Sequence, residues 1–231
     1  MVNPVYAFVR FIFKVSNEKP VVHGAGNYDE SAPAIFMCNH EKFYGPIMAQ
    51  TRFPIKTRTW ANSMTTETKA CNRYIAESLL IGEKGWKKFP AFLVGYLTGW
   101  FVSFIIRSAK PIVSYWDKKR SRQSIRAGVE AIAKGENQLL FARRKEFTEG
   151  RVRFMQGYRI ICRMAARKHG ITPLLYPVSF NRYNKTIAIG KPTSFDISKD
   201  FDIESKRVDE YLLAQVRLGY LEPGKMAAAD I

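Results

Sequence analysis

Residues 34–46 have the sequence AIFMCNHEKFYGP. The first five residues are uniformly apolar, which is typical of a strand buried on both faces, and a polar block follows at once. A histidine placed directly after such a strand lies where α/β sheets hold their ligands. The sequence therefore predicts a buried strand over residues 34–38 and a functional loop that contains His40.

Short apolar segments alternate with amphipathic helical patterns along the rest of the chain. The expected strands cover residues 21–23, 111–115, 138–141, 174–180 and 186–189. The expected helices cover residues 65–80, 89–106, 121–134, 157–169 and 204–218. This order predicts an α/β fold, with a mixed sheet flanked by helices in a single layered domain over residues 20–231. An N-terminal amphipathic helix over residues 1–19 precedes that domain.

The charge of the chain indicates an anionic partner. Lys and Arg number 37 against 20 Asp and Glu, which gives a net charge of +17 over 231 residues. Nucleic acid, an anionic membrane and a phosphorylated substrate all fit this excess. No recognised nucleic-acid module is present, so we expect no nucleic acid as partner.

Cysteine and histidine each occur three times, and neither residue has a metal-ligand spacing. We therefore predict no metal site and no disulfide framework. Unpaired cysteines fit a reducing compartment such as the cytoplasm.

Two segments have the pattern of membrane-facing helices. Residues 4–14 place Val5, Phe8 and Ile12 on one face, with Arg10 and Lys14 beside it. This helix either lies on a membrane surface or packs on the protein's own core.

Residues 89–106 carry no charge and include a Gly95-x-x-x-Gly99 pattern that allows close helix packing. We expect this helix to be half buried in the protein and to face a bilayer or lipid with its other half. A membrane-spanning helix is the alternative, because the segment is just short of a comfortable span.

Three consecutive cations, Arg143, Arg144 and Lys145, follow the expected strand 138–141. Guanidinium groups bind phosphate with two parallel hydrogen bonds, so this turn is a candidate phosphate site. A solvated basic loop is the alternative interpretation.

The order of these blocks resembles the glycerolipid acyltransferase family, which includes the 1-acylglycerol-3-phosphate acyltransferases. Asn39-His40 is similar to the family's first block, and residues 111–115 lie where the second falls. Residues 130–141 are similar to the approach to the third block, and residues 171–178 to the fourth. The resemblance covers about residues 20–195 and lies in order and spacing.

The resemblance implies acyl transfer from a thioester to a hydroxyl, with His40 as general base. Substrate contacts are then expected from Asn39, Tyr44, Tyr115, Arg143, Arg144 and Lys145. The donor would be acyl-CoA or an acyl carrier protein, and the acceptor a phosphorylated glycerolipid such as a lysophospholipid or glycerol phosphate. No further cofactor is implied. The protein is then expected on an anionic membrane surface, at the cytoplasmic side, peripheral or partly embedded.

The chain departs from the family at three positions. Gly45 replaces the aspartate that orients the family's histidine, and a cation, Arg143, aligns with its glutamate. Tyr115 and Trp116 stand where an arginine is expected. An alternative orienting group would be Glu41, Tyr44 or a carboxylate from residues 146–149. The second hypothesis is an acyltransferase fold that has lost catalysis and binds lipid as an accessory protein.

Overall fold

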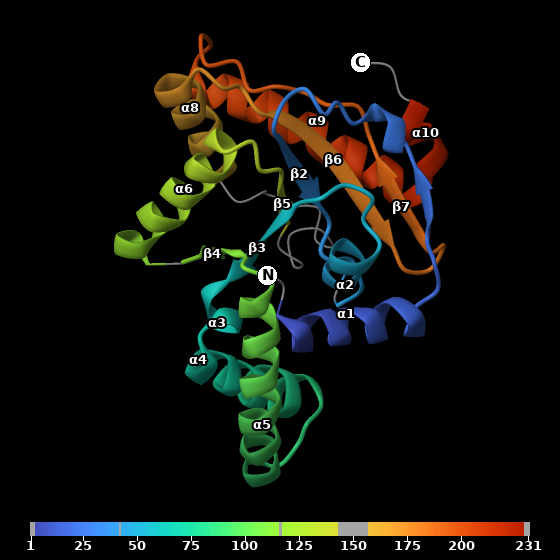
Figure 1. The fold of residues 1–231 in the computed structure, drawn as a ribbon, viewed down its shortest axis with the longest axis vertical. Helices are drawn as coiled ribbons and strands as arrows, with labels where there is room; N and C mark the ends of the chain where they lie inside the picture. Colours follow the sequence, from blue (N-terminus) through green and yellow to red (C-terminus); the bar gives the residue numbers. More distant parts are fainter. Residues whose placement is uncertain (1–2, 42, 116, 143–156, 229–231) are drawn as a thin grey trace. The chain divides into compact units, whose positions relative to one another are not determined.

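The computed structural model describes residues 3–41, 43–115, 117–142 and 157–228. The chain forms two compact units (Figure 1). The smaller unit comprises Met1–Phe11 with Thr59–Ser124, and the larger comprises Ile12–Arg58 with Ile125–Ile231. Contacts thus divide the chain at other places than the sequence-based division into residues 1–19 and 20–231.

The larger unit contains a mixed sheet with the strand order β1-β7-β6-β2-β5. Its strands are β1 (Val21–His23), β2 (Ala34–Cys38), β5 (Gln138–Phe141), β6 (Leu174–Asn181) and β7 (Thr186–Ile189). The central strand β2 runs parallel to both neighbours, β5 and β6, whereas β7 is antiparallel to β6 and parallel to β1. The predicted α/β class with a mixed sheet flanked by helices is confirmed.

The helices whose bounds the structure gives are α1 (Pro4–Ser16), α2 (Tyr44–Thr51), α3 (Ser63–Thr66), α4 (Thr68–Arg73), α5 (Lys88–Ser108), α6 (Lys118–Ala133), α8 (Gly157–His169), α9 (Phe201–Leu221) and α10 (Pro223–Ala228). A 3₁₀ turn, η1, covers Ala25–Asn27, and a π-helical segment, η2, covers Tyr74–Glu83.

The two faces of the larger sheet are covered by different helices. Alternate residues of β2 and β6 point to one face, where Phe36, Tyr176 and Phe180 pack with Met48 of α2. The other face contacts α9, which lies behind β6 in Figure 1. Gly219 allows this approach, because a Cβ there would lie 3.0 Å from the Cβ of Ser179. The core is thus built on both sides of β2, and its carboxyl end carries His40.

The smaller unit contains the parallel pair β3 (Arg58–Asn62) and β4 (Ile112–Ser114), together with α3, α4, η2 and α5. Within it, α5 packs along α4 and η2, as Figure 1 shows for the green helix. Cys71, Ile75, Leu80 and Ala91 form a separate buried cluster there.

Several predicted bounds differ from the structure. The expected helix 65–80 is divided into α3, α4 and η2, because Glu67 adopts an extended conformation between α3 and α4. The segment after His40 was predicted as a loop, but α2 begins at Tyr44. Pro46 lies in the first turn of α2, where its missing N–H costs nothing. Strand β3 was not predicted, since only Trp60 of its residues is buried.

No residue of α1 is buried, so this helix does not pack into the protein's core. Phe8, Phe11 and Val15 are 63%, 60% and 64% exposed. Arg52 fixes its end by donating hydrogen bonds from Nη2 to the backbone oxygens of Lys14 and Asn17.

Candidate functional site

His40 lies two residues beyond the end of β2, between the neighbouring strands β5 and β6. Its ring packs at 5.4 Å from the ring of Phe141, the last residue of β5. Phe141 in turn packs at 6.2 Å from Phe180 of β6. The imidazole therefore packs against one aromatic ring, and His40 remains partly exposed at the carboxyl edge of the sheet.

Asn39, the residue before His40, is held in place by hydrogen bonds to the neighbouring strand β6. It is 1% exposed, and its side-chain amide forms hydrogen bonds with both the backbone N–H and the backbone carbonyl of Phe180 in β6. Nδ2 donates to the backbone oxygen of Phe180 at 2.8 Å, and the Phe180 N–H donates to Oδ1 at 2.7 Å. The Asn39 side chain thus adds two hydrogen bonds to β6 directly after Cys38, the last residue of β2. These contacts give Asn39 a positioning role, and its expected contact with a substrate stays a prediction.

Glu41, the residue after His40, is held in place by an ion pair with Arg182. Its Oε1 lies 3.1 Å from Nε of Arg182, which follows directly after β6. Glu41 has a φ of +33°, a conformation that non-glycine residues seldom adopt. Arg182 also lies over the ring of Tyr183 at 4.5 Å. The pKa of Arg182 is raised, first by its hydrogen bond to the Tyr183 hydroxyl and further by the charge of Glu41.

We call the Asn39–Phe180 and Glu41–Arg182 contacts together the β6 bracket. Both end on residues at the carboxyl end of β6, and they hold the residues on either side of His40. The backbone that carries the imidazole is therefore fixed at two points, and His40 as a whole is partly exposed although its Nδ1 atom is buried.

Tyr44, the first residue of α2, lies beside this bracket. Its hydroxyl is buried and has no hydrogen-bond partner among the described residues. The pKa of Tyr44 is raised, chiefly by burial and then by the charges of Glu18 and Glu41. The side chain lines an open hollow of about 220 Å³. The remaining lining residues are Ser16, Asn17, Glu18, Arg182 and Lys185. Lys185 forms an ion pair with Glu18, so the hollow carries charges of both signs.

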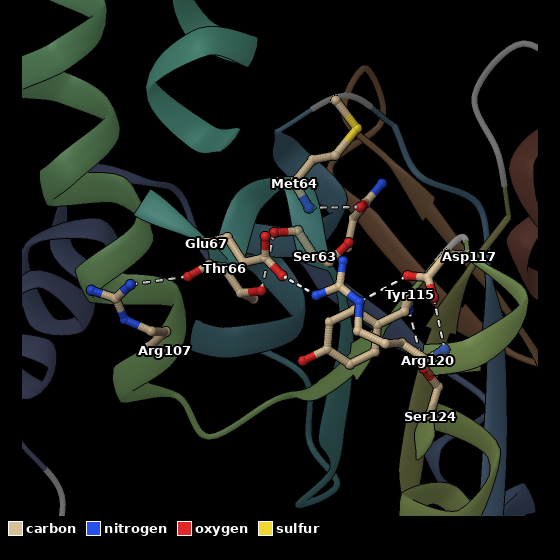
Figure 2. A network of polar contacts seen from close by, with 10 residues as sticks. Ser63, Met64, Thr66, Glu67, Arg107, Tyr115, Asp117, Arg120 and Ser124 are labelled. Carbon is tan, nitrogen blue, oxygen red and sulfur yellow. Dashed lines mark hydrogen bonds and ion pairs between the residues drawn. The ribbon is translucent and has the colours of Figure 1, made fainter. Parts of the chain in front are cut away.

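Tyr115 lies in the smaller unit, in a polar network of its own (Figure 2). Its N–H donates to Oγ of Ser124 at 3.1 Å, and the guanidinium of Arg120 lies 4.5 Å from its ring centroid. Arg120 bridges Glu67 and Asp117, both at 2.8 Å. Arg120, which lies in α6 five residues after Tyr115, therefore connects this ring to two carboxylates. Two carboxylates already neutralise it, so it is not prepared to bind a phosphate.

The candidate phosphate residues Arg143, Arg144 and Lys145 lie outside the described residues. The same holds for the carboxylates of Glu146 and Glu149, which were considered as orienting groups for His40. The structure brings Asn39, His40 and Tyr44 together in the larger unit.

Arg182 was missed by the sequence analysis. It belongs to the turn between β6 and β7, and no local pattern links it to a histidine 142 positions earlier in the chain. Only the parallel β2–β6 register, which pairs Cys38 with Val178, shows that this turn lies beside the His40 loop.

Within the described parts of the chain, no group of three or more His, Cys, Asp or Glu side chains is placed to hold a metal ion. The three cysteines, Cys38, Cys71 and Cys162, are all buried and free. Burial raises the pKa of the Cys162 thiol to about 12, so this cysteine is not a nucleophile at neutral pH.

No protein-family model matches this chain, and no curated protein resembles it in sequence.

Proposed function

We propose that the protein is a membrane-associated acyltransferase. It moves a fatty acyl group from an acyl thioester, acyl-CoA or an acyl carrier protein, to a hydroxyl of a lysophospholipid or glycerol phosphate. His40 is the general base of this reaction. The single observation that supports the proposal best is the position of His40, partly exposed at the carboxyl edge of the central strand and flanked by the two contacts of the β6 bracket.

The proposed chemistry needs one base near neutral pH. An ordinary imidazole has a pKa near 6.5 and accepts a proton from a hydroxyl at pH 7. The acceptor oxygen attacks the thioester carbonyl carbon while His40 takes the hydroxyl proton. The tetrahedral intermediate then collapses, the carbon–sulfur bond breaks, and the leaving thiolate takes the proton back from the imidazolium. The products are an ester and a free thiol.

The exposed apolar helices and the positive charge support membrane association. The apolar side chains of α1 are exposed beside Arg10 and Lys14, and the net charge is +17. A basic amphipathic helix binds an anionic interface through both its apolar area and its charge. The electrostatic part should weaken with salt, because the screening length falls from about 10 Å at 0.1 M to about 3 Å at 1 M. Flotation with anionic vesicles at the two salt concentrations measures this part, and protein that stays in the soluble fraction at low salt would argue against membrane association.

The activity is tested with purified protein, acyl-CoA or acyl carrier protein as donor, and a panel of lysolipids and glycerol phosphate. Release of free thiol and formation of the esterified lipid are measured together, because thiol release alone also reports hydrolysis. His40→Ala is the negative control and His169→Ala the matched one. Thiol release that depends on His40 and on the acceptor supports the proposal, whereas equal rates in wild type and His40→Ala contradict it.

One observation favours the second candidate, a lipid-binding protein without catalysis. Gly45, which replaces the family's aspartate, is buried, and a Cβ at this position would lie 2.6 Å from the backbone oxygen of His40. Position 45 therefore supplies no carboxylate to orient His40, and a histidine without an orienting group is a poor base. A protein that binds lysolipid or acyl-CoA, but forms no ester with any donor and acceptor pair, would match this second function.

A further inference from the structure

The inner face of α5 consists of small residues. Ala91, Gly95, Gly99 and Ser103 recur every four residues and are its buried positions. A Cβ at Gly95 would lie 2.7 Å from the Cβ of Ala76 in η2. Near the other end, Ser103 Oγ lies 3.1 Å from Oγ1 of Thr68 in α4. The backbones of the two segments therefore lie in close contact, and α4, η2 and α5 form one tight hairpin, which we call the α4–α5 hairpin.

The outer face of α5 is large, apolar and aromatic. Phe89 is 83% exposed, Tyr96 and Leu97 are each 64% exposed, and Trp100 is 55% exposed. With Leu93 and Phe101 these residues form a continuous stripe along the helix. Among the described residues, α5 is also the one helix long and apolar enough to cross a membrane. A contiguous apolar surface of this length marks a site of interaction with a membrane or a partner protein.

The opposite side of the hairpin is polar. Lys69, Arg73 and Glu77 of α4 and η2 are exposed. Arg73 and Glu77 follow directly after Asn72 and Ala76, the two residues that contact Gly99 and Gly95 of α5. These charges therefore lie level with the middle of α5. If α5 crossed a bilayer together with its partner segment, both charges would lie near the hydrocarbon centre, where charged side chains are costly.

The tip of the hairpin is basic. Lys84, Lys87 and Lys88 are exposed around Trp86, which is itself 41% exposed. Lysines attract anionic headgroups, and a tryptophan suits the interface between headgroups and acyl chains. The same charges disfavour a second copy as the occupant, because each chain carries +17.

From these observations we propose that α5 lies in the plane of an anionic membrane. Its aromatic stripe enters one leaflet, its basic tip contacts the headgroups, and the charged side of α4 and η2 remains in water. The helix therefore does not cross the bilayer. This inference rests on the membrane association proposed above and on nothing at His40.

The face of the hairpin that docks is tested with a matched pair of substitutions. Leu97→Asp places one negative charge on the aromatic stripe, and Ser78→Asp places the same charge on the opposite, exposed side. Binding is measured by flotation with vesicles of phosphatidylglycerol and phosphatidylcholine in a 3:7 ratio. We expect at least a tenfold loss of affinity for Leu97→Asp and less than a threefold loss for Ser78→Asp. Equal losses for both, or none for Leu97→Asp, would overturn the proposal.

The orientation is tested with nitroxide labels at single introduced cysteines, Phe89→Cys, Leu97→Cys and Phe101→Cys on the stripe, and Glu77→Cys on the polar side. In-plane docking gives the three stripe labels similar depths within one leaflet and leaves the Glu77→Cys label in water. A label at residue 97 that lies far deeper than the one at residue 89, or a Glu77→Cys label within the hydrocarbon, shows a crossing helix and refutes the proposal. A stable dimer in solution that buries the stripe refutes it as well. None of these measurements uses acyl transfer, so their results can be interpreted even if the protein has no acyltransferase activity.

Discussion

Glu41 and Arg182 form an ion pair, with 3.1 Å between Oε1 and Nε, that joins the residue after His40 to the end of β6. The residue before His40 is joined to the same strand through the Asn39 amide and the backbone of Phe180. The imidazole is therefore carried by a segment that is held on both sides by one neighbouring strand. Catalytic groups need such fixed supports, since a misplacement of about 1 Å can cost about 10²-fold in rate.

Breaking the ion pair should lower turnover far more than stability. Arg182→Gln leaves the sheet intact, and an ion pair whose Arg182 side chain is 37% exposed to solvent contributes little to folding stability. We expect kcat to fall about 10- to 100-fold in Arg182→Gln and in Glu41→Gln, with a smaller change in KM. Steady-state kinetics with saturating acyl donor separates the two constants.

The control for this prediction is Lys206→Gln, which removes an exposed ion pair with Glu210 on α9 and should change neither constant. A swapped variant, Glu41→Arg with Arg182→Glu, should recover part of the lost turnover. If both single variants keep wild-type kcat, the bracket does not position His40.

His40→Ala should abolish acyl transfer and leave folding nearly unchanged. A general base contributes about 10²–10⁴ in rate, and the side chain is only half-buried. His23→Ala in β1 and His169→Ala at the end of α8 are the matched controls, since neither residue lies near the His40 loop in sequence. Turnover is followed by free-thiol release and folding by thermal melting. Turnover within a few-fold of wild type in His40→Ala would remove His40 from the mechanism.

The place of His40 was predictable because its signal is local. The apolar run from Ala34 to Cys38 predicts a buried strand, and the polar residues that follow predict a loop at its end. The α/β class followed from the same kind of local alternation between apolar strands and amphipathic helices. The small-residue spacing within α5 likewise indicated that one side of that helix is buried, and Gly95 and Gly99 are buried there.

The structural features that were not predicted from the sequence depend on tertiary contacts or on misleading local signals. The partner of Glu41 lies 141 positions away in the chain, and only the β2–β6 pairing brings it close. Helix α2 was missed because Gly45-Pro46 is a common turn signal, although proline also suits the first turn of a helix. The arginine stacked on Tyr115 was missed for a related reason, since Arg120 reaches back from α6 across the intervening turn.

Replacing Asn39 should destabilise the larger unit. Asn39→Ala removes two buried hydrogen bonds and leaves the N–H and carbonyl of Phe180 without these partners, and each buried unsatisfied group costs about 1–3 kcal/mol. Asn39→Asp should not restore stability, because a carboxylate accepts from the N–H but has no donor for the carbonyl. Denaturant unfolding measures the loss. Asn17→Ala is the control, since its Nδ2 bond to Phe13 is exposed. An Asn39→Ala protein as stable as wild type would show that the bracket is not held by this side chain.

Restoring the family's aspartate at Gly45 should harm the protein. Gly45 has an ordinary helical backbone, so the constraint is space and not φ: a Cβ would lie 2.6 Å from the His40 backbone oxygen and 3.3 Å from that of Asn39. Overpacking of this kind costs about 1–3 kcal/mol. Because 1 kcal/mol shifts Tm by about 2–4 °C in a domain of 150–250 residues, both Gly45→Ala and Gly45→Asp should melt several degrees lower. The displaced backbone belongs to His40 itself, so turnover should fall in both variants, and the added carboxylate should bring no gain.

Gly26→Ala is the matched control, because no atom lies within 4 Å of a Cβ at that position. The opposite result, in which Gly45→Asp melts like wild type and raises a low activity while Gly45→Ala does not, would mean that His40 lacks an orienting group in this protein. That outcome would favour the non-catalytic lipid-binding function over the acyltransferase.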